Sequence, residues 1–206
     1  MTDKYSCFEH LSANESRGAD YEIVRRLGTS GIAVIGIHGG DIEPWTSEIA
    51  EAIAGPDHSF YTLKGLKKTA NSDLHITSTR FDEPEALEIV SRSKTVISIH
   101  GSSEEEEFVL VGGIDTTLSR CIEAKLQQAG FKTSRTKKDG KSGNLGGRDK
   151  RNICNRSVRA MGVQLEISKG LRARLFRHGE AEAGRALLDF VRAVREAVEE
   201  SGKEGR

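Results

Sequence analysis

Two short apolar runs of the chain end in the same way, and this repeated ending constrains the fold more than any other feature. Residues 31–40 read GIAVIGIHGG and residues 94–102 read KTVISIHGS, so each run closes on a histidine followed by glycine. Apolar runs of this length are typical of strands and are too short for a buried helix. We therefore expect two strands that carry His38 and His100 at their carboxyl ends.

Helical patterns alternate with strand-like runs along the rest of the chain. Helices are expected over 12–28, 44–55, 82–93, 114–130 and 182–200, and further strands over 59–65, 107–113 and part of 158–172. Pro44 suits the first position of the second helix. The alternation predicts one α/β domain over 1–206, with a mixed, mostly parallel sheet covered on both faces. Residues 196–206 are expected to form a frayed tail.

Composition excludes several classes of protein. The 31 Lys+Arg residues balance the 31 Asp+Glu residues, which argues against a generally basic nucleic-acid binder. No run approaches the roughly 20 apolar residues that span a bilayer. The first residues carry no export signal, so a cytoplasmic monomer without a membrane partner is expected. The three cysteines are far apart and predict neither a disulfide framework nor a zinc knuckle.

One segment interrupts the alternation and concentrates positive charge. Residues 132–159 contain ten Lys and Arg residues against two Asp residues, a local excess of eight positive charges. The segment is also rich in glycine, which predicts a long loop, and long loops within compact domains are usually functional or disordered. This loop is therefore the expected contact for a polyanionic partner.

The stretch that follows the first apolar run suggests a metal site. His38 and Glu43 are five residues apart, which would place them about 140° apart on a helix. They can converge if His38 ends a strand, the following glycines form a tight turn, and Pro44 keeps Glu43 extended. His100 reaches the same edge of the sheet if the two strands are parallel neighbours. Two histidines and a carboxylate are a typical zinc ligand set. The alternative is that these residues are ordinary polar groups at strand ends.

Glu166 is a lone acid inside the strand-like run GVQLEIS. A carboxylate is costly to bury without a partner, so an acid on an inner strand needs a chemical reason. A hydrolase that activates water on a metal requires a base that is not itself a ligand. Glu166 is the candidate for that base, unless it lies on the solvated face of an edge strand.

Four stretches occur in a characteristic order: HGGDIE at 38–43, LHITSTRFDEP at 74–84, SIHG at 98–101 and GVQLEIS at 162–168. In this set and order the chain resembles the poly-γ-glutamate hydrolase family of phages and bacilli, from about residue 19 to residue 168. The resemblance implies an open-sandwich α/β fold similar to the zinc carboxypeptidases, and zinc-dependent cleavage of γ-glutamyl amide bonds.

The resemblance also implies roles for single residues. His38, Glu43 and His100 correspond to the zinc ligands, and Glu166 to the general base. Asp41 stands where the shorter spacing of zinc carboxypeptidases would place the carboxylate, so it remains the alternative ligand to Glu43.

Further residues are candidates for binding the substrate. Arg80 resembles the substrate-carboxylate arginine of carboxypeptidase-like deacylases, and His75 is expected to orient substrate or a ligand. Within the basic segment, the candidates for binding a carboxylate or the oxyanion are Arg148, Asn152, Asn155 and Arg156. For each of these the alternative is a solvated loop residue or a satisfied strand-end group.

Three functions are compatible with the sequence. The first is a zinc amidohydrolase that acts on poly-γ-glutamate or related γ-glutamyl peptides, reached after lysis or inside the cell. The second is a zinc-dependent deacylase of a small N-acyl amino acid. The third is a non-catalytic polyanion-binding module. Nucleic acid is not expected as a partner, because residues 132–159 lack the interleaved aromatic side chains that stack on bases.

Overall fold

The computed structural model describes residues 3–134, 146–177 and 181–204, and its centre is one seven-stranded sheet. The strands are β1 (Tyr21–Arg26), β2 (Ile32–Gly40), β3 (Ser59–Gly65), β4 (Thr95–Ser102), β5 (Val109–Gly113), β6 (Thr133–Ser134) and β7 (Val163–Ser168). Their order across the sheet is β1-β3-β2-β4-β7-β5-β6. The central strands β2, β4 and β7 carry the residues singled out above.

Parallel pairing dominates the middle of the sheet. β2 is parallel to β3 and to β4, β4 is parallel to β7, and β5 is parallel to β6. The pairs β1–β3 and β5–β7 are antiparallel. The predicted mixed, mostly parallel sheet is therefore confirmed. In such a sheet the carboxyl ends of neighbouring parallel strands share one edge, where ligands usually bind.

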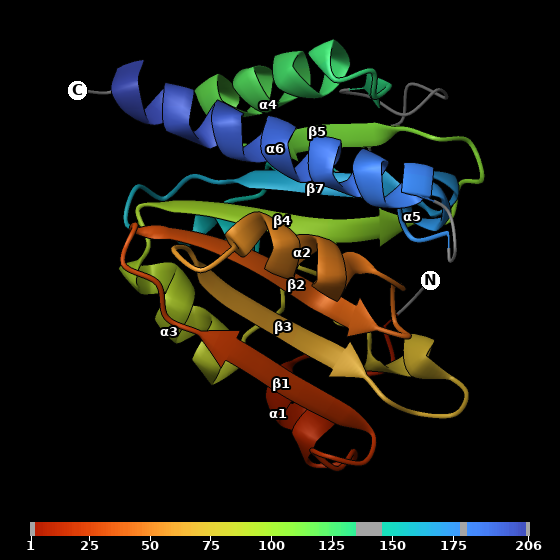
Figure 1. Cartoon of the computed structure of the whole chain (residues 1–206). Coiled ribbons are helices and arrows are strands. Elements are labelled where there is room, and N and C mark those ends of the chain that lie inside the picture. Colours follow the sequence, from red (N-terminus) through yellow and green to blue (C-terminus); the bar gives the residue numbers. More distant parts are fainter. Residues whose placement is uncertain (1–2, 135–145, 178–180, 205–206) are drawn as a thin grey trace.

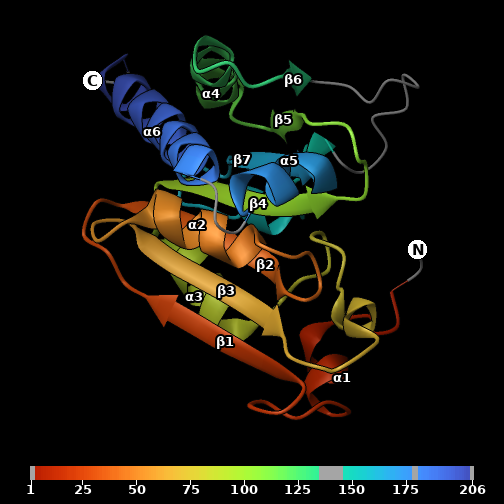
Figure 2. The same ribbon diagram turned by 45° about the vertical axis from the view of Figure 1, so that its right-hand side comes forward.

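Helices cover both faces of the sheet (Figures 1 and 2). The helices are α1 (Phe8–Ser12), α2 (Thr46–Ala54), α3 (Pro84–Arg92), α4 (Thr116–Gln128), α5 (Lys169–Leu175) and α6 (Ala181–Glu204), with the 3-10 turns η1 (Asn71–Leu74) and η3 (Ile153–Asn155). One face packs against α2, α4, α5 and α6, and the other against α1, α3 and the two 3-10 turns. This arrangement confirms the α/β sandwich in a single domain, while the specific likeness to zinc carboxypeptidases stays a prediction.

The helix expected over 12–28 is wrong. Helix α1 already ends at Ser12, Gly18 takes a positive φ of 88°, and residues 21–26 form the edge strand β1. Tyr21 and Ile23 alternate with exposed neighbours and are buried against β3 and α1, so a period of two prevails over the helical reading. Aromatic and β-branched side chains in YEIV also favour a strand.

The frayed tail expected over 196–206 is also wrong for residues 196–204, which continue helix α6. Ala197 and Val198 are buried in the core, and Lys125 of α4 forms ion pairs with Glu196 and Glu200. Packing along α4 therefore extends the helix beyond its apolar centre. Residues 205 and 206 lie outside the described residues.

No disulfide joins Cys7, Cys121 and Cys154, and of the three only Cys154 is buried. None of the described helices is long and apolar enough to cross a membrane.

Candidate active site

A bulge in β2 decides which way His38 points. Between Gly36 and Gly39 strand β2 advances three residues while β3 advances two. Side chains added at Gly36 and Gly39 would both meet α2 or Thr62, so both positions face α2. Ile37 and His38 therefore share the opposite face, where strict alternation would have turned His38 toward α2. Bulges often re-aim a side chain next to a functional site in this way.

His38 is completely buried and bonded through both ring nitrogens. Its Nε2–H donates to the carbonyl of Ile76 at 2.9 Å, and its Nδ1 lies 3.0 Å from Oε1 of Glu43. Burial lowers the pKa of His38, but the charge of Glu43 and these hydrogen bonds outweigh it, so the pKa is raised overall. Nδ1 of His38 and Oε1 of Glu43 thus face each other as two possible donor atoms for a metal ion.

Glu43 is held between two strands by the turn that follows β2. Its backbone N–H donates to the carbonyl of His38 at 2.9 Å, and Gly40 supplies a positive φ of 59°. One carboxylate oxygen faces His38, and the other accepts a hydrogen bond of 2.7 Å from the N–H of Gly101 on β4. Burial raises its pKa, but His38, His100 and Gly101 lower it to about 2. Glu43 is therefore an ionised carboxylate.

The start of α2 differs from the expectation. Trp45 takes a left-handed conformation with φ of 70°, and the helix begins at Thr46, so Pro44 does not occupy its first turn. The Thr46 hydroxyl donates to the Glu43 carbonyl at 2.8 Å and tightens the turn. Glu43 thus lies outside the helix, as predicted, and Asp41 is exposed at the start of the turn.

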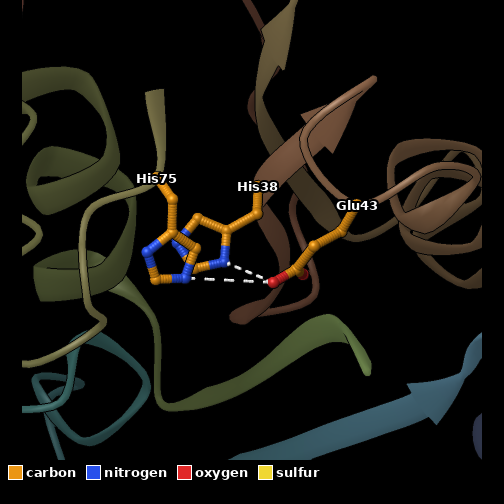
Figure 3. A group of neighbouring side chains, drawn as sticks. All are labelled: His38, Glu43 and His75. Atoms are coloured by element: carbon orange, nitrogen blue, oxygen red, sulfur yellow. Dashed lines mark hydrogen bonds and ion pairs between the residues drawn. The ribbon is translucent and has the colours of Figure 1, made fainter. Parts of the chain in front are cut away.

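Two more histidines face the Glu43 carboxylate. Nδ1 of His100 lies 3.8 Å from Oε2, and its Nε2 shares a hydrogen bond of 2.9 Å with Ser98. Nε2 of His75 lies 4.0 Å from Oε1, and its Nδ1–H donates to Asp3 at 2.7 Å. Figure 3 shows His38 and His75 on the same side of Glu43.

The pKa values of His100 and His75 are both lowered, which favours the neutral imidazole. Burial lowers the pKa of His100 to about 3, although Glu43 raises it, and the charge of His38 and burial lower the pKa of His75. Neutral imidazole is the form that binds metals. One nitrogen each of His38 and His75 and one oxygen of Glu43 lie within 4.8 Å of one another. Because His100 faces the other oxygen, two donor sets share His38 and Glu43, and the sequence had singled out only the set with His100.

Glu166 stands beside this cluster. It pairs in register with His100 across β4 and β7, so both side chains lie on the same face of the sheet. The amide of Gln164 donates to Oε1 of Glu166 at 2.8 Å and in turn accepts from Asn152 at 2.8 Å. The side chain is buried, so the alternative of a solvated edge strand is wrong.

One pocket of about 420 Å³ brings these groups together. It is lined by His38, Glu43, His75, His100, Asn152, Gln164 and Glu166, together with residues 77–79 and 101–104. Carboxylate, imidazole and amide groups of this kind, at the carboxyl edge of a parallel sheet, can hold a metal ion and accept a proton.

Among the other candidate residues, Asn152 lines this pocket, whereas Arg80 and Asn155 do not. Arg80 forms an ion pair of 2.5 Å with Asp3 and does not line the pocket among the described residues. Asn155 is buried. Its amide donates to the carbonyls of Gly147 and Asp149 and accepts from the N–H of Gly162, so its role is structural.

The basic segment is only partly described. Residues 135–145, including Lys137, Lys138 and Lys141, lie outside the described residues. From 146 onward the chain packs against the pocket wall, where Arg156 donates to the carbonyl of Thr79 at 3.5 Å. Arg148 is exposed.

Three residues of this region were missed from the sequence. Asp3 orients His75, Gln164 orients Glu166, and Arg172 lies buried beneath Gly101. Gln164 shares the alternation of Glu166 within VQLEIS, and this pattern marks it as a neighbour on the same face. No local pattern links Asp3 to His75, because they are 72 residues apart.

Comparison with known proteins identifies the family. The family model described as poly-gamma-glutamate hydrolase matches residues 5–191. The chain belongs to the poly-gamma-glutamate hydrolase family. Among its relatives, the UPF0714 protein YndL of Bacillus subtilis is 41% identical over 174 residues, which cover 84% of this chain and 67% of YndL.

Solved structures of this family agree with the fold. A bacteriophage poly-gamma-glutamate hydrolase has a TM-score of 0.87 and 32% identity, covering 97% of this chain and 98% of the other. The zinc-free apo form of YndL has a TM-score of 0.87 and 36% identity, covering 97% of this chain and 99% of the other. A poly-gamma-glutamate hydrolase fold therefore surrounds the cluster of Glu43 and the histidines.

Proposed function

We propose that this chain is a zinc-dependent hydrolase that cleaves the γ-glutamyl amide bonds of poly-γ-glutamate or of related γ-glutamyl peptides. The observation that carries the proposal is one pocket that holds Glu43, its histidines and Glu166, in a chain of the poly-gamma-glutamate hydrolase family. Support for zinc comes from the cluster of Glu43 with His38 and His75, whose donor atoms lie within 4.8 Å of one another, and from the zinc-free form in which the related YndL was solved.

The residues present fit zinc. Imidazole nitrogens with one carboxylate suit zinc better than magnesium or calcium, which prefer oxygen ligands. His38, Glu43 and His100 would hold the ion. Nδ1 of His38 faces Oε1 of the Glu43 carboxylate, and Nδ1 of His100 faces Oε2. We assign His75 to the orientation of substrate or water, since its ring is 36% exposed while those of His38 and His100 are buried.

Zinc bound there would lower the pKa of a water ligand and polarise the amide carbonyl. The chain's own groups then carry the proton. The Glu166 carboxylate takes the proton of the attacking water and delivers it to the leaving amine. Gln164 fixes one oxygen of this carboxylate by a hydrogen bond of 2.8 Å, so its orientation is set before substrate binds.

The substrate adds a requirement for positive charge. Each γ-linked glutamate carries a free α-carboxylate, and arginine binds carboxylates through paired N–H groups. Segment 132–159 is rich in cations, and one of the described ones, Arg156, donates a hydrogen bond to the carbonyl of Thr79 on the pocket wall. The same excess of positive charge favours a polymer over a small N-acyl amino acid.

The conservative variant Glu166→Gln tests this function. Depolymerisation of poly-γ-glutamate, followed by chain length, is expected to fall about 10²–10⁴-fold, the usual contribution of a general base. Zinc content should match that of the wild-type chain, because Glu166 is not a ligand. Wild-type chains that leave the polymer intact while releasing the acyl group of a small N-acyl glutamate would contradict the proposal and favour the deacylase.

A further inference from the structure

Arg172 of α5 is a buried arginine with incomplete bonding. Its side chain is 4% exposed, and it lies so close to Gly101 that a β-carbon there would overlap the guanidinium. Nη1 donates to the carbonyl of Ser102 at 3.2 Å and to the carbonyl of Ile167. Nε is buried and has no hydrogen-bond partner in the part of the chain that the structure describes. Buried donors are nearly always paired in native proteins, so this one calls for an explanation.

Arg172 lines a second pocket that adjoins the first. This pocket of about 660 Å³ also contains Ile42, Pro44 and Lys169. Glu43, His75 and residues 101–103 line both pockets. Glu43 and His75 therefore lie at the junction, with His38, His100 and Glu166 lining the first pocket and Arg172 the second. A chain-like substrate that crosses the cluster would enter both pockets.

Charge pairing separates Arg172 from the other cations near the cluster. Lys4 pairs with Glu15 and Asp73, Lys169 pairs with Glu105, and Arg80 pairs with Asp3. Arg172 forms no ion pair among the described residues. Burial lowers the pKa of Arg172, and the charges of Glu43, Glu166 and Glu104 oppose this shift. Its charge and part of its hydrogen-bonding capacity remain available to a ligand.

We propose that Arg172 recognises the free α-carboxylate of the glutamyl residue next to the scissile bond. This inference rests on the proposed function and names the residue that selects a γ-linked acidic chain. Arg172 does not take part in proton transfer. It determines specificity, since it rejects a chain whose α-carboxylates are blocked. Its backbone bonds hold the guanidinium in place, so the carboxylate meets a group that is already oriented.

Binding is measured by calorimetry in zinc-loaded Glu166→Gln chains, so that the ligand is not consumed. The probes are a short γ-linked glutamate oligomer and the same oligomer with its α-carboxylates converted to amides. Arg172→Gln is expected to weaken binding of the free acid about tenfold or more, the usual loss for a charge-assisted hydrogen bond, and to leave the amide unchanged. Arg174→Gln, on the same helix but paired with Glu107, is the matched control and should change neither affinity.

Each outcome decides the inference. Equal weakening of both oligomers, or no weakening of either, assigns Arg172 a structural role and leaves the proposed function intact. If the parent chain binds neither oligomer, the proposed function fails and the inference fails with it. Thermal unfolding of each variant checks folding. If Arg172→Gln does not fold, Arg172→Lys, which keeps the charge and loses the planar fork, must still reduce the preference for the acid over the amide.

Discussion

The Glu43 carboxylate shows how single contacts shape the site. One oxygen faces His38 on β2, and the other accepts the N–H of Gly101 on β4. A carboxylate bonded in this way stays ionised, with a pKa of about 2. Glu43 is therefore held by groups on two strands at once. Asp41, the alternative ligand, is exposed to solvent.

Glu43→Gln tests this residue. The amide keeps the shape of the side chain but loses the negative charge, so we expect zinc affinity to fall by about 100-fold or more. Competition with a chelator measures the affinity. Asp41→Asn is the matched control and should bind zinc as the wild type does. If Asp41→Asn lost zinc affinity and Glu43→Gln kept it, Asp41 would be the ligand.

The choice between His100 and His75 is a second test at this scale. His100→Ala removes a proposed ligand, and we expect the purified chain to lose its zinc. His75→Ala should keep the metal and lose activity, because His75 is assigned to orientation. Elemental analysis and depolymerisation on the same samples separate the two. Loss of zinc from the His75 variant alone would favour the set of His38, Glu43 and His75.

Asp3 links stability to pH. Burial raises its pKa, but hydrogen bonds from Thr77 and His75 lower it from 3.8 to about 2. Because the folded pKa lies below the unfolded one, the carboxylate stabilises the fold above pH 4, and this contribution fades as the pH falls toward 2. Asp3→Asn should lower the free energy of unfolding at pH 7 by about 1–3 kcal/mol. Denaturation at several pH values should show the wild type and the variant converging near pH 2. A difference that persists there would contradict the assignment.

At the scale of elements, the bulge of β2 is the feature that the site depends on. It turns His38 to the face that carries His100 and Glu166, and it brings Gly39 against Ser47 and Thr62. The two glycines after His38 are therefore needed for separate reasons: Gly39 for close packing and Gly40 for its positive φ.

Gly39→Ala tests the bulge. The added methyl group overlaps Ser47 and Thr62, so we expect a loss of about 1–3 kcal/mol in the free energy of unfolding, together with weaker zinc binding. Gly184→Ala in α6 is the control, since nothing lies within 4 Å of the added atom. There alanine should stabilise the helix by about 0.5–1 kcal/mol. If the two variants changed the free energy of unfolding by the same amount, the close packing at Gly39 would not be needed for the bulge.

At the scale of the whole molecule, periodicity predicted most of the architecture. The runs ending in His38 and His100 are strands of one mostly parallel sheet, and the helices over 82–93 and 114–130 lie where the pattern put them. Prediction failed where long-range packing decides the structure. Burial of Tyr21 and Ile23 made a strand of residues 21–26, and contacts with α4 extended α6 to Glu204.

The site was predictable to the extent that strand ends converge in parallel sheets. The convergence of His38, Glu43, His100 and Glu166 on one pocket follows from that rule, while their roles in metal binding and proton transfer stay predictions from the family resemblance. The contribution of Asp3 could not be found, because the N-terminal segment reaches His75 only through the fold. Arg172 was missed for a related reason, since its burial depends on Gly101 of a different strand.

Metal content and depolymerisation, measured together on wild-type chains and on His38→Ala, test the central claim most directly. A site with imidazole and carboxylate ligands predicts about one zinc per wild-type chain and shortening of poly-γ-glutamate, with both lost in the variant. Asp41→Asn, purified in parallel, should retain both. A wild-type chain that cleaves the polymer without bound metal, or a His38→Ala chain that keeps its zinc and its activity, would contradict the metal centre.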